Sequence, residues 1–143
     1  MSEDPHSMSA PLLDVRDLEV AFGQGPARVD AVRKVSFAIA PGETLALVGE
    51  SGSGKSVTAL SILRLLPYPA ASHPGGQILF HGRDLLTASD RDLRGVRGAA
   101  ISMIFQEPMS SLNPLHNAER QITEVLAVHR GLRGPQARQR ALD

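Results

Sequence analysis

Residues 44–56 read TLALVGESGSGKS, and this stretch decides the fold class. A short apolar run, 44–48, passes directly into a loop rich in glycine, as expected of a strand buried in a parallel sheet. After the loop, apolar side chains recur at helical spacing until Pro67 stops the pattern. The apolar positions are Ala59, Ile62, Leu63 and Leu66. The order strand, glycine-rich loop and helix predicts an α/β fold of the P-loop NTPase class.

The loop from Gly49 to Ser56 matches the pattern G-x-x-x-x-G-K-[ST], which binds the phosphates of ATP. Glycines allow successive amides to face phosphate oxygens, with the positive end of the helix behind them. Lys55 supplies a charge for the β- and γ-phosphates, and the Ser56 hydroxyl is placed to coordinate Mg²⁺. The alternative, a glycine turn that only caps a helix, is disfavoured by the strand and helix on either side. The candidate ATP ligands are Gly49, Glu50, Ser51, Gly52, Ser53, Gly54, Lys55, Ser56 and Val57.

Apolar alternation predicts strands at 15–22 and 35–39, and the turn residues between them favour an antiparallel pair. Beyond Pro67 we expect a loop to Gly76, a strand at 77–81 and a short helix with Ser89 as N-cap. A further strand is expected at 101–105. Two helices complete the order: an amphipathic one carrying Ile122, Val125, Leu126 and His129 and closed by Gly131, and another beginning near Pro135.

The composition limits the class of protein. The chain has 143 residues, 42% of them hydrophobic, which corresponds to one domain or a piece of one. Fifteen basic residues balance fifteen acidic ones, so no overall charge attracts nucleic acid or anionic lipid. There is no cysteine for a disulfide or a thiolate metal site. Residues 1–11 are acidic and interrupted by proline, and they are interpreted as a flexible leader.

Residues 105–114, FQEPMSSLNP, carry the resemblance to a family. They resemble the Q-loop of ABC ATPases in the form found in dipeptide and oligopeptide importers. The stretches LALVGESGSGKSVTALSILRLLP (45–67), LRGVRG (93–98) and EVLAVHRG (124–131) are similar to Yej-type importers of peptides and microcin C. The resemblance covers nearly all of the chain after the leader.

The resemblance implies roles for two more residues. Gln106, at the end of the predicted strand, would contact Mg²⁺ and the attacking water. The alternative for a lone glutamine is a solvated strand end, and the ten-residue match argues against it. Phe22 lies where the family places an aromatic ring that stacks on adenine, although an ordinary core residue on a strand would look the same.

By the same resemblance, residues 12–143 are the N-terminal part of a nucleotide-binding domain. An antiparallel β subdomain would precede the P-loop core, and the start of an α-helical subdomain would follow it. The implied partners are transmembrane permease subunits, a second ATPase domain in a dimeric sandwich and, indirectly, a periplasmic peptide-binding protein. No nucleic acid is implied. The implied location is peripheral, at the cytoplasmic face of the bacterial inner membrane.

Several family motifs do not occur in this sequence. There is no Asp-Glu pair for the catalytic base, no Leu-Ser-Gly-Gly-Gln signature and no later switch histidine. Residues 74–77, PGGQ, imitate the end of the signature but precede a predicted strand, so we interpret them as a turn. We therefore expect a truncated chain that binds ATP without hydrolysing it and exposes unpaired strand edges.

Other interpretations stay open on sequence alone. A soluble P-loop kinase would share the phosphate loop but not the segment 105–114. A non-transport ABC ATPase of DNA repair or translation is a second alternative; the neutral charge and, more strongly, the peptide-importer form of segment 105–114 argue against it. His81, His116 and His129 lack metal-ligand spacing, and the arginines of 133–140 are interpreted as a solvated helix face.

Overall fold

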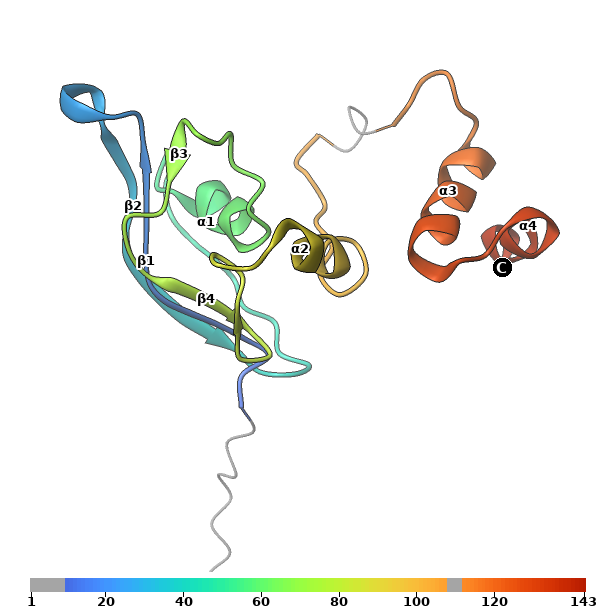
Figure 1. Ribbon diagram of the computed structural model, residues 1–143, viewed down its shortest axis with the longest axis horizontal. Coiled ribbons are helices and arrows are strands. Elements are labelled where there is room, and N and C mark those ends of the chain that lie inside the picture. Colours follow the sequence, from blue (N-terminus) through green and yellow to red (C-terminus); the bar gives the residue numbers. More distant parts are fainter. Residues whose placement is uncertain (1–9, 108–111) are drawn as a thin grey trace, which may run out of the picture. The chain divides into compact units, whose positions relative to one another are not determined.

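Residues 15–22, whose apolar alternation predicts a strand, are part of a longer strand in the first part of the structure (Figure 1). The structure, a computed structural model, describes residues 10–107 and 112–143, and the chain divides into two compact units between Leu93 and Arg94. The strands are β1 Leu13–Phe22, β2 Val29–Ile39, β3 Ala71–Ser72, β4 Gln77–Phe80 and β5 Arg83–Asp84. The helices are η1 Gly25–Ala27, α1 Lys55–Ile62, α2 Asp90–Val96, α3 Ala118–Arg130 and α4 Gly134–Leu142.

The five strands form one antiparallel sheet in the order β2-β1-β4-β5, with β3 also paired to β1. The predicted antiparallel pair is confirmed, because β1 and β2 pair from Leu13↔Ile39 to Phe22↔Val29. Their register shifts where Asp17 and Lys34 adopt positive φ, and the Asp17 amide donates to the Ser36 hydroxyl over 2.7 Å. The largest fully buried apolar side chains of this unit are Val15, Leu18, Val20, Ile78, Leu85 and Leu93.

The backbone of segment 74–77 passes very close to β1 as it makes the predicted turn into β4. The Glu19 amide donates to the Gly75 carbonyl over 3.0 Å, and Gly76 has φ of 94°. A methyl group on Gly76 would lie 2.5 Å from the carbonyl oxygen of Asp17. Only glycine fits this approach, so the turn residues are explained by packing against β1 and not by a signature helix.

Helix α1 differs in two ways from the predicted helix. It ends at Ile62 with Leu63 as C-cap, well before Pro67, although Leu63 and Leu66 are buried. The buried helical positions are Thr58 and Ser61, whereas the predicted apolar positions Ala59 and Ile62 are only half-buried. Short side chains on the buried face suit a helix packed closely against β1 and β2.

The strands predicted at 44–48 and 101–105 are absent from the described residues. Segment 44–48 is unpaired, with Leu45, Leu47 and Val48 exposed by 40%, 41% and 91%. In segment 101–105 only Ile101 forms a β-bridge, to Arg97. A parallel strand requires neighbours for its backbone groups and cover on both faces. The described part of the chain supplies neither to these segments, so the predictions of a buried parallel strand at 44–48 and of a strand at 101–105 are wrong for it.

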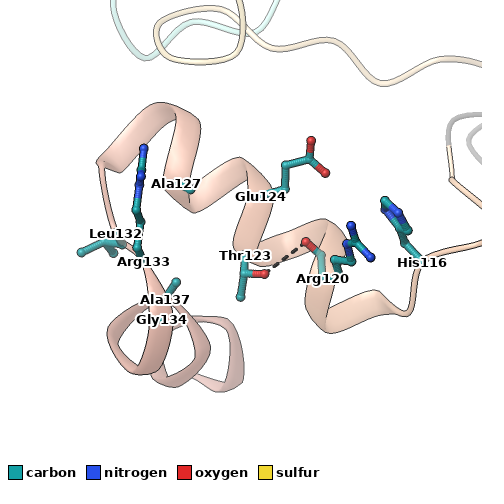
Figure 2. A pocket seen from close by; sticks show the side chains of 9 residues that line it. All are labelled: His116, Arg120, Thr123, Glu124, Ala127, Leu132, Arg133, Gly134 and Ala137. Carbon is teal, nitrogen blue, oxygen red and sulfur yellow. Dashed lines mark hydrogen bonds between the residues drawn. The ribbon is translucent and has the colours of Figure 1, made fainter.

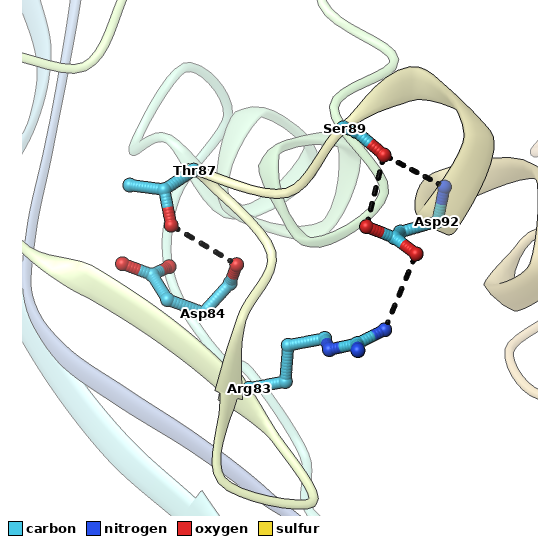
Figure 3. Close-up of polar contacts among 5 residues, drawn as sticks. All are labelled: Arg83, Asp84, Thr87, Ser89 and Asp92. Carbon is cyan, nitrogen blue, oxygen red and sulfur yellow. Dashed lines mark hydrogen bonds and ion pairs between the residues drawn. The ribbon is translucent and has the colours of Figure 1, made fainter.

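The start of α2 is held by the predicted cap, as Figure 3 shows. The Ser89 hydroxyl accepts the Asp92 amide over 3.2 Å and donates to the Asp92 carboxylate over 2.9 Å. Arg83 of β5 pairs with the same carboxylate at 3.4 Å. The carboxylate of Asp84 accepts the Leu86 amide over 3.0 Å, which shapes the connection from β5 toward α2. These contacts confirm Ser89 as an N-cap.

The second unit contains α3 and α4, and the predicted end of α3 and start of α4 are confirmed, whereas the N-cap of α3 was not predicted. Asn117 caps α3 by accepting the Arg120 amide over 2.8 Å, and Gly131 ends the helix with φ of 67°. Pro135 lies in the first turn of α4, and Arg138 pairs with Glu119 of α3 at 3.2 Å. None of the helices in the described ranges combines the length and apolarity that crossing a bilayer requires.

The environment of His73 predicts that the free energy of unfolding depends on pH. Its Nδ1 lies 3.4 Å from the Tyr68 hydroxyl, and its buried Nε2 has no hydrogen-bond partner among the described residues. Burial lowers the pKa of His73 below its ordinary value of 6.5, and the Arg64 guanidinium lowers this pKa further. The unfolded chain therefore takes up this proton at a higher pH than the folded chain. We expect the free energy of unfolding to be highest above pH 6.5 and to decrease as the pH falls below it.

Denaturant titrations from about pH 7.5 to about pH 5.5 cover the range in which histidine titrates. His73→Gln should remove part of the decrease. His81→Asn is the control, since His81 is exposed and asparagine tolerates its left-handed backbone. An undiminished decrease in His73→Gln would contradict this account.

Candidate phosphate-binding site

The loop 49–54 connects segment 44–48 to the N-terminus of α1. Gly52 and Gly54 have φ of 79° and 88°, a conformation that side chains disfavour. A methyl group on Gly54 would lie 2.6 Å from the Ala31 carbonyl oxygen of β2. This close approach fixes the loop against the sheet.

The Lys55 ammonium is folded back onto the loop. It donates to the carbonyls of Gly49 and Glu50 over 2.7 and 2.6 Å, and to the Ser53 hydroxyl over 3.1 Å. The Ser53 amide in turn donates to the Glu50 carbonyl over 3.3 Å. The charge of Lys55 therefore lies inside the curve of the loop.

The N-terminus of α1 is positive and carries no compensating side chain. Its N-cap is Gly54, which has no side chain to accept the free amides, and its first turn contains no acidic residue. The free amides and the helix dipole favour an anion here. The cavity at this end has a volume of about 150 Å³ and is lined by Ala31, Gly52, Ser53, Gly54, Lys55, Ser56 and Val57.

The structure thus brings together most of the residues that the sequence singled out. Residues 52–57 line the cavity, and Gly49 and Glu50 supply carbonyls to Lys55. Sequence reasoning missed Ala31. Its small side chain on a strand gave no signal, because its proximity to Gly54 arises only from the fold.

Phe22 is the last residue of β1, where it is half-buried and pairs with Val29 and Ala71. It does not belong to the lining of the cavity at Lys55, so both interpretations of its ring, adenine stacking and core packing, remain predictions.

Gln106 belongs to the second unit and is exposed there. Of the segment that carries the family resemblance, Pro108, Met109, Ser110 and Ser111 lie outside the described residues. The proposed contact of Gln106 with Mg²⁺ stays a prediction.

The donor set at the loop fits Mg²⁺ only together with a phosphate ligand. No cluster of three or more His, Cys, Asp or Glu capable of holding a metal occurs in ranges 10–107 and 112–143. Ser56, which lines the cavity, provides one neutral oxygen. Mg²⁺ commonly retains waters and binds few protein oxygens beside substrate phosphates, so a hydroxyl at this position is compatible with such a site.

A second cavity, of about 400 Å³, lies between α3 and α4 (Figure 2). Arg120, Arg133 and Glu124 are among its lining residues. Because charges of both signs line it, it lacks the single-sign field that would select a phosphate.

Comparison with known proteins identifies the family. The family model described as "ABC transporter" matches residues 32–142. The chain is 67% identical over 133 residues to the Peptidoglycan transport ATP-binding protein YejF of Agrobacterium fabrum, covering 93% of this chain and 24% of that protein. It is 48% identical over 132 residues to the Oligopeptide transport ATP-binding protein OppD of Bacillus subtilis, covering 92% and 37%.

A solved structure described as "Dimeric Structure of MJ0796, a Bacterial ABC Transporter Cassette" superposes with a TM-score of 0.75 at 25% identity. The superposition covers 91% of this chain and 54% of that chain. The chain spans about a quarter of the length of the YejF relative and just over half of the cassette.

The contact between Gly54 and Ala31 can be tested by substitution. Gly54→Ala adds both an unfavourable φ and a clash, so we expect the free energy of unfolding to fall by about 1–3 kcal/mol. Binding of inorganic triphosphate should weaken by about tenfold or more, a change of about 1.4 kcal/mol or more, because the amides at α1 are displaced. Gly52→Ala is the matched control, since it changes a similar φ but places its methyl group in open space. Chemical denaturation and calorimetry measure both effects. Equal losses of stability in the two variants would rule out the clash.

Proposed function

Because this chain belongs to the ABC transporter family, we propose that it binds ATP through residues 49–57 and is part of the ATP-binding subunit of a peptide importer. The observation that carries the proposal is the Lys55 ammonium held inside a glycine loop at the uncompensated N-terminus of α1. The whole protein would be an ATPase, in keeping with the cassette structure that this chain resembles.

Each part of the loop has a separate task in ATP binding. The backbone amides of the loop and of the first turn of α1 would donate to the phosphate oxygens, and Lys55 would place its charge beside the β- and γ-phosphates. Ser56 and Gln106 would hold Mg²⁺, whose charge offsets that of the two phosphates when it is bound. We assign Gln106 the place beside the attacking water, and Phe22 the stacking of adenine.

We further propose that ATP drives two such ATPase units together and that the loss of its contacts separates them. The dimeric cassette supports pairing of two units. Permease subunits in the membrane would receive this motion from ATPase units bound at its cytoplasmic face, and a periplasmic binding protein would deliver the peptide. The names of the relatives, which refer to peptidoglycan and oligopeptide transport, support substrates that contain peptides. They also favour transport over a soluble kinase or a non-transport ABC ATPase.

Lys55→Ala tests the ATP site. We expect binding of Mg-ATP to fall below detection by isothermal titration calorimetry of the full-length protein, because the charge beside the β- and γ-phosphates is lost. The melting temperature should change little, since the loop containing Lys55 is at the surface. Lys34→Gln removes the same charge from an exposed position of β2 and should leave ATP binding intact. Unaltered ATP affinity in Lys55→Ala would refute the site.

Phe22→Ala tests the assignment of the adenine contact. If the ring stacks on the base, ATP affinity should fall by about 5- to 150-fold, the range expected for loss of an aromatic stack of about 1–3 kcal/mol. Binding of inorganic triphosphate should hardly change. Phe80→Ala, on β4 and also half-buried, controls for lost packing in the sheet. Equal losses of both ligands in Phe22→Ala would assign Phe22 to the core.

A further inference from the structure

Every N–H group of the Lys55 ammonium has a hydrogen-bond acceptor within the loop. A lysine ammonium has three N–H groups. In the loop they have three acceptors: the carbonyls of Gly49 and Glu50 and the hydroxyl of Ser53. An arriving phosphate therefore meets an ammonium whose donors are all occupied.

The three acceptors are not equivalent. The two carbonyls belong to the backbone and bind at 2.7 and 2.6 Å, whereas the Ser53 hydroxyl lies at 3.1 Å on an exposed residue. Charged hydrogen bonds are stronger when shorter, and a hydroxyl can turn away without movement of the backbone. Ser53 is thus the acceptor that Lys55 can exchange most easily.

The position of the hydroxyl depends on its neighbours. A methyl group on Gly49 would lie 2.6 Å from the Ser53 oxygen, so the missing side chain at 49 makes room for this hydroxyl. The Ser53 amide is fixed by the Glu50 carbonyl. The hydroxyl is therefore placed beside Lys55 by the loop itself.

We propose that Ser53 is a positioning residue: its hydroxyl holds the third N–H of Lys55 while the loop is free of nucleotide and yields it to a phosphate oxygen on binding. This inference rests on the proposed function, and it adds that the side chain at 53 lowers the affinity for nucleotides with a β-phosphate. The two carbonyl bonds are kept throughout, so the loop keeps its shape as Lys55 exchanges partners.

Ser53→Ala removes the acceptor that competes with phosphate. The net strength of one such hydrogen bond corresponds to a change of about 2- to 10-fold in affinity. Calorimetry on the full-length protein should therefore show Mg-ATP and Mg-ADP bound about 2- to 10-fold more tightly by Ser53→Ala, with AMP affinity unchanged. Ser53→Thr keeps the hydroxyl and should resemble the original protein. As a second readout, the Lys55 ammonium protons should exchange with water faster in nucleotide-free Ser53→Ala.

The outcomes separate the two proposals. If the original protein does not bind ATP, the proposed function is wrong. If it binds ATP but Ser53→Ala binds ATP equally or more weakly, Ser53 is not a competing acceptor and only this inference is overturned. Tighter binding of AMP to the same degree would also overturn it, because AMP has no β-phosphate for Lys55.

Discussion

The close approach between Gly54 and the carbonyl of Ala31 is the constraint on which the site depends. It joins two parts of the chain that are otherwise organised separately, the antiparallel sheet and the loop before α1. The sheet obtains its backbone hydrogen bonds from pairing of β1 with β2, β3 and β4. The segment 44–48, which leads into the loop, has no such pairing in the described structure. Three contacts therefore fix the position of the loop. They are the close approach of Gly54 to β2, the hydrogen bonds from Lys55 to the loop carbonyls, and the packing of α1 against β1 and β2.

Local signals predicted the parts of the fold whose energetics are local. The β1–β2 pair, the Ser89 cap and the Gly131 end of α3 all follow from residues a few positions apart, because turns and caps satisfy nearby backbone groups. The short strand β3 was missed because its two residues pair with the end of β1, some fifty positions away in the sequence. Segments 44–48 and 101–105 were predicted as strands from apolar runs alone. Apolarity indicates that a strand would be buried if it had neighbours, but it does not supply them.

The residues of the site also fall into two groups, those that the local sequence pattern predicted and those that it could not predict. Residues 49–56 were predicted together because glycine, lysine and serine at this fixed spacing before a helix form the pattern of a phosphate-binding loop. Ala31 could not be predicted, since its contribution is a carbonyl oxygen brought near Gly54 by the sheet. The position of Gln106 and the stacking of Phe22 depend on groups other than their own neighbours in sequence. Their assignment therefore rests on family resemblance and awaits substitution experiments.

Lys55 holds the shape of the loop through its hydrogen bonds and also supplies a positive charge. A substitution at position 55 therefore changes both properties at once. Removal of the ammonium leaves the carbonyls of Gly49 and Glu50 without their partner and at the same time removes the positive charge. Loss of phosphate binding after such a change would contain both effects. Ser53 allows them to be separated, because its hydroxyl contacts the same ammonium while the two carbonyl bonds remain. A change at 53 alters the number of free donors on Lys55 without altering its charge. The strength of the Lys55 contact with phosphate can thus be varied while the loop keeps its shape.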